Sequence, residues 1–244
     1  MKKSINVAFS ADIEDNLVTK WLSQQYEVTV IKLGNLKSLS NDSSILDNID
    51  LLVLIGGEDV NPEYYNEKLG KFTRINSKRD KSEFEFLQCT NVSYSLINKI
   101  PKLGICRGAQ LLTVYNGGKL IQHVTGHNSN QQNIELDNGG SIVVSSDHHQ
   151  MMYPFNLNKE NYKLIGWSKN FQSNTYLNGN NEEINLPDNF LEPEIVYYNH
   201  TNSLCIQSHP EWCIGEQGSN HLLNILDNCL FNKNVEKYNS YKVL

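Results

Sequence analysis

The stretch Lys102-Leu103-Gly104-Ile105-Cys106-Arg107-Gly108-Ala109-Gln110 decides the fold of this chain. Residues 102–105 are expected to form a short buried strand, and the chain then passes at Cys106 directly into a helix. Gly104 and Gly108 flank the thiol and leave the room that a tight turn requires. A strand, a sharp turn and a helix form the context of a nucleophile elbow, which presents a reactive side chain at the edge of an α/β sheet.

The position of Cys106 favours its thiolate form. At the start of a helix, exposed backbone N–H groups and the positive end of the helix dipole stabilise a negative charge. A small apolar filler is the better interpretation for Cys89, Cys205 and Cys229, whereas Cys213 lies close to a second motif described below. Five cysteines without a C-x-x-C pair are typical of a reducing compartment.

The rest of the chain alternates short apolar runs with amphipathic stretches, which is typical of β-α units around a mainly parallel sheet. We expect strands at residues 5–10, 26–33, 50–55, 102–105, 133–136, 141–145, 162–168, 194–199 and 203–208, and helices at about 15–24, 79–97, after 106 and at 218–231. The sequence therefore predicts one domain over residues 1–244, with a flavodoxin-like three-layer α/β sandwich as its fold. The polar, Asn-rich segment 169–193 is predicted to be a loop or insert and the part most prone to disorder.

The composition of the chain indicates which kinds of molecule it is expected to bind. The chain has 244 residues, 39% of them hydrophobic, which is enough for one substantial core. Its formal net charge of -6, with acidic and basic residues interleaved, argues against a nucleic-acid surface. No stretch resembles a signal sequence, and none reaches the roughly 18 apolar residues of a membrane span. We expect a cytoplasmic protein that binds a small molecule or another protein.

Ser208-His209-Pro210-Glu211-Trp212 supplies the groups that a thiolate nucleophile needs. The nucleophile requires a base, and the base requires an orienting group on its other nitrogen. His209 follows a predicted strand, so it should emerge at the same sheet edge as Cys106. Pro210 then fixes a turn that lets Glu211 fold back toward the imidazole. Alone, His-Pro-Glu is equally well explained as a surface turn, but with the elbow it predicts a Cys106, His209 and Glu211 triad.

Acyl transfer also needs donors for a developing oxyanion. Gly56-Gly57-Glu58-Asp59-Val60 directly follows the predicted strand 50–55. We expect the backbone N–H groups of Gly57 and Arg107 to form this oxyanion hole. A lone Gly-Gly pair would be interpreted as a simple turn.

His123, His127, His148 and His149 raise the alternative of a metal site, since the first two are four residues apart. However, residues 124–126 read Val-Thr-Gly, a poor helix sequence, and no cysteine or acidic cluster accompanies the histidines. We therefore expect neither a metal nor a cofactor.

In this order, and over most of the chain, the motifs resemble those of the class I glutamine amidotransferases and their hydrolase relatives. The resemblance is strongest to the gamma-glutamyl-gamma-aminobutyrate hydrolase type, because Cys-Arg-Gly occurs together with His-His-Gln. Further matching motifs are Gly-Gly-Glu-Asp-Val-Asn-Pro (56–62), Arg79-Asp80 with Glu83, Gly117-Gly118-x-Leu120 with Gln122, Ser146-Asp147-His148-His149-Gln150, and Gln207.

The resemblance implies the class I glutamine amidotransferase fold and attack of Cys106 on a γ-glutamyl amide, followed by hydrolysis of a glutamyl thioester. It also implies that Gln110, Ser146, His148 and His149 contact the glutamyl group. The chain departs from the family pattern on the leaving-group side. Ser145 replaces the usual Asn before Ser146, and only Glu192-Pro193-Glu194-Ile195 remains of an acidic motif. The long insert before that motif suggests a remodelled leaving-group pocket.

Two other functions share these residues. A glutaminase subunit that supplies ammonia to a separate synthetase would use the same triad, and a catalytically inactive binding module would keep the same fold. The sequence leaves the oligomeric state open, a homodimer included.

Overall fold

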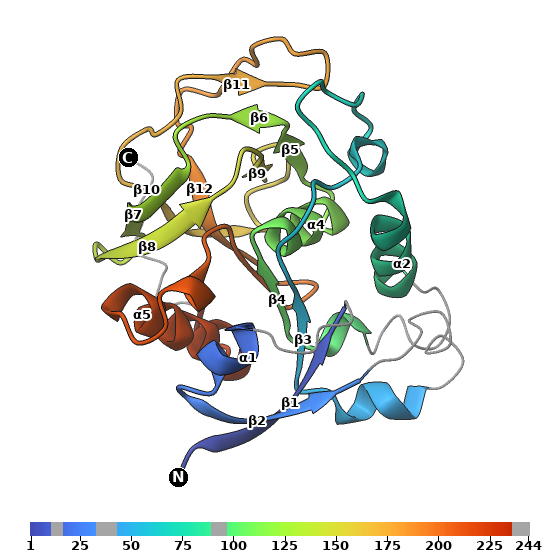
Figure 1. Ribbon diagram of the computed structural model, residues 1–244, viewed down its shortest axis with the longest axis vertical. Coiled ribbons are helices and arrows are strands. Elements are labelled where there is room, and N and C mark those ends of the chain that lie inside the picture. The colour runs from blue at the N-terminus through green and yellow to red at the C-terminus, as the bar shows by residue number, and fades with distance from the viewer. Residues whose placement is uncertain (11–16, 33–42, 89–96, 236–244) are drawn as a thin grey trace.

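A computed structural model gives the fold, and it describes residues 1–10, 17–32, 43–88 and 97–235. A central sheet lies between two layers of helices (Figure 1). Within the described residues the sheet has nine strands in the order β2-β1-β3-β4-β13-β12-β10-β7-β8. The strands are β1 (Lys3–Phe9), β2 (Tyr26–Ile31), β3 (Leu51–Leu54), β4 (Lys102–Ile105), β7 (Asn128–Leu136), β8 (Ser141–Asp147), β10 (Lys163–Ser168), β12 (Pro193–Tyr198) and β13 (Ser203–Ile206).

Neighbouring strands are parallel from β2 as far as β13, and every pairing from β13 to β8 is antiparallel. The change of direction follows from connection length: β12 joins β13, and β7 joins β8, through four residues each, and such short connections only link antiparallel neighbours. Two small sheets lie beside the main one, β5 (Lys119–Ile121) with β9 (Met151–Tyr153), and β6 (His123–Val124) with β11 (Tyr176–Leu177).

Helices cover both faces of the sheet. In the part of the chain that the structure describes they are α1 (Leu17–Leu22), α2 (Ser77–Leu87), α4 (Arg107–Tyr115) and α5 (Gln217–Leu226), with the 3-10 turns η2 (Ser43–Asn48), η3 (Pro62–Tyr65) and η4 (Pro210–Trp212) and the π-helical turn η5 (Asp227–Phe231). The helix predicted at 79–97 is described as far as Leu87, and residues 89–96, with Cys89, lie outside the described part. In the described residues no helix is long and apolar enough to cross a membrane.

Alternating side chains of the strands build two hydrophobic cores. Leu51 and Val53 of β3 point to the face covered by α1 and α5, whereas Leu52 and Leu54 point to the face covered by α2 and α4. Strands buried on both faces read as continuous apolar runs, and the Leu-Leu-Val-Leu sequence of β3 has this pattern. The expected three-layer α/β sandwich is confirmed.

Segment 169–193 lies mostly outside helices and strands. Its inner side is nevertheless part of the protein interior. Tyr176 and Phe190 pack with Val124 and Met151 in a third hydrophobic cluster. The expectation of disorder does not fit these contacts: a few apolar anchors hold a stretch whose composition is otherwise polar.

Candidate active site

Cys106 sits between β4 and α4 in a strained backbone conformation. Its φ of 51° and ψ of -112° are rare for a residue with a side chain. The turn tolerates no larger neighbours, because a Cβ at Gly108 would lie 2.0 Å from the carbonyl oxygen of Leu54. The backbone N–H of Cys106 donates to the Ile206 carbonyl at 2.8 Å, which ties the elbow to β13. The predicted nucleophile elbow is therefore present.

The fold brings His209 to this elbow from the end of β13. A Cβ placed on Gly56 would lie 3.2 Å from His209 Cε1 and 3.7 Å from Cys106 Cβ, so the three residues surround one small space. His209 Nδ1 lies 2.8 Å from Glu211 Oε1. Burial alone would lower the pKa of His209, but its hydrogen bonds with Cys106 and Glu211 outweigh burial and raise the pKa to about 10. The arrangement therefore favours an imidazolium beside the thiol at neutral pH.

Gly57 follows Gly56 in the loop after β3. Gly57 has a φ of 146°, and a Cβ there would lie 2.3 Å from Nη1 of Arg79. Arg79 donates from Nη1 to the Gly56 carbonyl and from Nη2 to the Ile55 carbonyl, each at 3.0 Å. With both carbonyls held by one guanidinium, the peptide that carries the Gly57 N–H group has a fixed orientation.

A buried network of ion pairs supports both this loop and the elbow. The Arg107 side chain is 1% exposed and pairs with Asp80 and Glu83 of α2. Glu83 also contacts Arg79 at 3.3 Å, so two arginines and two carboxylates balance one another. The motif Arg79-Asp80 with Glu83 was recognisable in the sequence, but nothing local to it indicated that it joins Arg107. Because these ion pairs engage the Arg107 side chain, the backbone is the part of that residue that remains available to a substrate.

The residues predicted to contact the glutamyl group occupy different depths. Cys106 Sγ lies 3.9 Å from the Asp147 carbonyl, so the loop of the His-His-Gln motif runs beside the elbow. Gln110 is 3% exposed and donates from Nε2 to the Gln150 carbonyl at 3.0 Å, beneath that loop. Ser146 and His148 are also buried. His149 is the accessible one, with 42% of its side chain exposed and Nε2 3.1 Å from Asp59 Oδ1.

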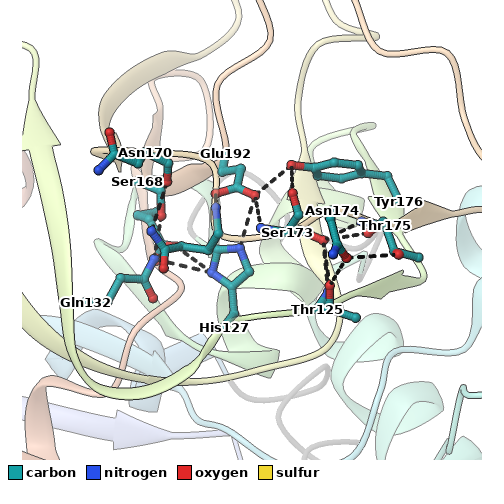
Figure 2. A network of polar contacts seen from close by, with 12 residues as sticks. Thr125, His127, Gln132, Ser168, Asn170, Ser173, Asn174, Thr175, Tyr176 and Glu192 are labelled. Carbon is teal, nitrogen blue, oxygen red and sulfur yellow. Dashed lines mark hydrogen bonds and ion pairs between the residues drawn. The ribbon is translucent and has the colours of Figure 1, made fainter.

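A second polar network lies in the interior, around His127 (Figure 2). His127 Nε2 is 3.4 Å from Glu192 Oε1, and His127 Nδ1 is 3.3 Å from Glu194 Oε1. Glu192 also accepts hydrogen bonds from the Ser173 backbone at 2.9 Å and from the Tyr176 hydroxyl at 2.7 Å. Burial would lower the pKa of His127, but the two carboxylates outweigh burial and raise it to about 9. A protonated His127 thus connects segment 169–193, through Glu192, to strand β12, through Glu194.

The network continues to the His-His-Gln loop. His148 Nε2 lies 3.8 Å from Glu194 Oε1, and His148 Nδ1 donates to the Gln150 carbonyl at 2.8 Å. Among the described residues, His127, His148 and Glu194 form the group that offers metal-type ligand atoms, all within 4.8 Å of one another. Glu194 Oε1 already accepts a hydrogen bond of 2.5 Å from Gln132 Nε2, and the His127 imidazolium lies between the Glu192 and Glu194 carboxylates. We therefore describe the cluster as an ion-pair network.

The sequence around this site matches a known protein family. The profile of the peptidase C26 family covers residues 11–176, which is more than half of the chain. The chain belongs to the peptidase C26 family. The matched range contains the Gly-Gly loop, the elbow and the His-His-Gln motif, whereas His209 and Glu211 lie beyond it and reach the site through β13.

Curated relatives of this peptidase C26 member align over part of their length. A candidate glutamine amidotransferase of Schizosaccharomyces pombe is 38% identical over 109 residues, 42% of this chain and 41% of that protein. A glutamine amidotransferase-like protein of Rickettsia prowazekii is 34% identical over 109 residues, 42% of this chain and 37% of that protein. The carbamoyl phosphate synthase small chain of Methanococcus vannielii is 31% identical over 65 residues, 27% of this chain and 18% of that protein. The aligned part thus spans about two fifths or less of these relatives.

Solved structures share the whole fold. A candidate GMP synthase subunit from Thermoplasma acidophilum superimposes with a TM-score of 0.57 at 17% identity, covering 97% of this chain and 98% of that chain. PurLQS from Thermotoga maritima gives a TM-score of 0.54 at 16% identity, covering 96% and 99%. At such identities the likeness concerns the fold alone.

Proposed function

We propose that this peptidase C26 member is a cysteine-dependent hydrolase that cleaves a γ-glutamyl amide through a glutamyl thioester, releasing glutamate and an amine. The observation that carries the proposal is the convergence of Cys106, on its strained elbow, with the hydrogen-bonded pair of His209 and Glu211. A nucleophile, a base and an orienting carboxylate in this relation are the minimum set for thiol-based acyl transfer.

The first half of the reaction forms the thioester. The Cys106 thiolate attacks the amide carbon, and the carbonyl oxygen becomes an oxyanion that the N–H groups of Gly57 and Arg107 stabilise. The imidazolium of His209 then donates its proton to the leaving nitrogen as the C–N bond breaks, and the amine departs.

The second half regenerates the enzyme. His209, now neutral, takes a proton from a water molecule as that water attacks the thioester carbon. The oxyanion forms again at Gly57 and Arg107, the C–S bond breaks, and glutamate leaves. Glu211 remains charged throughout and stabilises each imidazolium that forms.

We assign different roles in recognition of the glutamyl group to the accessible and to the buried residues. His149 is accessible and contacts Asp59, two residues after Gly57, so it is our assignment for direct substrate contact. Gln110 and His148 are buried and act from beneath, because both donate a hydrogen bond to the Gln150 carbonyl of the His-His-Gln loop, while Ser146 is buried in β8 just before that loop. Segment 169–193 forms the remodelled leaving-group side.

The test is a panel of γ-glutamyl conjugates, with free glutamate as the readout and Cys106→Ala as the blank. We expect turnover of at least one conjugate by the isolated chain, abolished in the variant. Absence of turnover across the panel, with the protein folded, would contradict a stand-alone hydrolase.

The relatives favour a second candidate, an ammonia-supplying subunit, because they include a carbamoyl phosphate synthase small chain, and the fold is shared with PurLQS. That function predicts weak glutaminase activity alone and a large increase on adding a synthetase. Strong hydrolysis of γ-glutamyl amines by the chain alone would eliminate it.

A further inference from the structure

Trp212 covers one face of the His209 ring. The two ring centroids are 3.8 Å apart and the planes differ by 2°. Trp212 is 48% exposed while His209 is 7% exposed, so the indole stands between the imidazole and solvent. Both rings are set by the 3-10 turn η4, which follows His209 and contains Trp212.

The solvent exposure of Trp212 is unusual for a tryptophan, and packing does not explain it. A tryptophan is normally well buried, and Trp21 and Trp167 of this chain are 0% and 4% exposed. The negative face of an aromatic ring attracts a cation placed over it, and tryptophan does so most strongly. The Nδ1 edge of His209 lies against Glu211, and the ring lies beside Cys106, so the faces of the ring are left for further contacts that act on its charge.

We propose that Trp212 is a positioning residue for His209, holding the imidazole in the plane that joins Cys106 to Glu211 and stabilising its protonated form by cation–π contact. The inference rests on the proposed function, in which that imidazolium is the proton donor to the leaving amine. Trp212 itself touches no reacting atom. It acts through His209, and its removal should change the pH range of activity more than substrate binding.

The direction of the effect follows from the charge. Stabilising the imidazolium delays its deprotonation as pH rises, so loss of the indole should move the alkaline limb of the kcat/KM profile to lower pH. A shift of about half a pH unit is expected for Trp212→Leu, equivalent to about 0.7 kcal/mol. Trp212→Phe keeps a smaller aromatic face and should shift by less. KM should change little in either variant.

Tryptophan fluorescence gives a readout that needs no substrate. An imidazolium in contact with an indole quenches its emission, so the emission of Trp212 should rise as His209 loses its proton. Since Trp21 and Trp167 are buried elsewhere, this transition should vanish in Trp212→Phe. In Cys106→Ala the transition should move to lower pH, because the thiolate that favours the imidazolium is gone.

These measurements separate the inference from the proposed function. Circular dichroism first verifies that both Trp212 variants are folded. A fluorescence transition that moves in Cys106→Ala supports the stack even if no conjugate is hydrolysed. An unmoved alkaline limb in Trp212→Leu, or no fluorescence transition in the wild type, overturns the inference even if hydrolysis is fast.

Discussion

Replacing Arg79 by methionine should disable the loop that carries Gly57 without removing any group that takes part in the reaction. Arg79 donates hydrogen bonds of 3.0 Å to the carbonyls of Ile55 and Gly56. A hydrogen bond involving a charged group contributes about 1.5–3 kcal/mol, so losing both costs about 3–6 kcal/mol if nothing replaces them. The side chain is 17% exposed, and water can take over part of the role. We expect about half of that cost in the free energy of unfolding.

The effect on catalysis should be larger than the effect on folding. Once the loop relaxes, the Gly57 N–H group no longer faces the oxyanion, and one such donor contributes about 2.7–4 kcal/mol to the activation barrier. Arg79→Met should therefore lower kcat by a factor of about 10² to 10³ while KM changes little. The assay is glutamate release from the best conjugate of the panel, with urea unfolding measured on the same preparation.

Lys81→Met is the matched control on the same helix. Lys81 pairs with Glu85 at 3.8 Å, but the two side chains are 65% and 44% exposed, so their ion pair contributes little. The control should keep wild-type activity. If folded Arg79→Met retains kcat within about threefold of wild type, or if Lys81→Met loses as much, the role assigned to Arg79 is wrong.

Other predictions concern the elbow, the triad and the buried network. Gly108→Ala should prevent stable folding, because the alanine Cβ would lie 2.0 Å from the Leu54 carbonyl oxygen. Soluble yield and circular dichroism would measure the loss of folded protein. A variant that folds normally and is active would contradict the described elbow. Glu211→Gln should reduce kcat less than His209→Asn, since the carboxylate orients and supports charge without moving a proton; kinetics that rank the two in the opposite order would contradict these roles. The pKa of His127 is raised to about 9, so its contribution to stability is complete below about pH 6.5 and is lost as pH rises through about 9. Thermal melting from pH 6 to 10 should show this loss in wild type but not in His127→Gln, and parallel curves would contradict the assignment.

Local chemistry made the elbow and the His-Pro-Glu turn predictable. The glycines around Cys106 and the proline after His209 dictate backbone geometry within a few residues, and the structure places β4 at the predicted 102–105. The parallel order of the strands then determines that both motifs end at one sheet edge.

The side-chain directions around the elbow could not be predicted in the same way. Residues 107–114 of α4 are all buried, so helical periodicity offers no polar face from which to orient Gln110. The family resemblance implied a substrate contact for Gln110, whereas its Nε2 donates to the Gln150 carbonyl beneath the His-His-Gln loop. A helix enclosed on every side has no sequence signal for direction.

Ion pairs between residues far apart in the chain also could not be predicted from the sequence. Glu192 and Glu194 flank a proline after a polar segment, which resembles an exposed loop, yet they are 1% and 0% exposed. Their partner His127 lies more than 60 residues earlier in the chain. Buried carboxylates are rare without a partner, so they could be identified only once that partner was located in space.

Selective labelling of Cys106 by a diazo-ketone analogue of glutamine tests the central claim most directly. Cys106 and Cys213 are 7% and 9% exposed, so accessibility alone predicts equal labelling. Burial raises the pKa of the Cys213 thiol, whereas Cys106 lies at the start of α4 beside His209, its proposed base. Peptide mapping by mass spectrometry should find the label on Cys106, prevented by excess γ-glutamyl substrate and greatly slowed in His209→Asn. Labelling of Cys213 in preference to Cys106, or equal labelling of both, would contradict the assignment of the nucleophile.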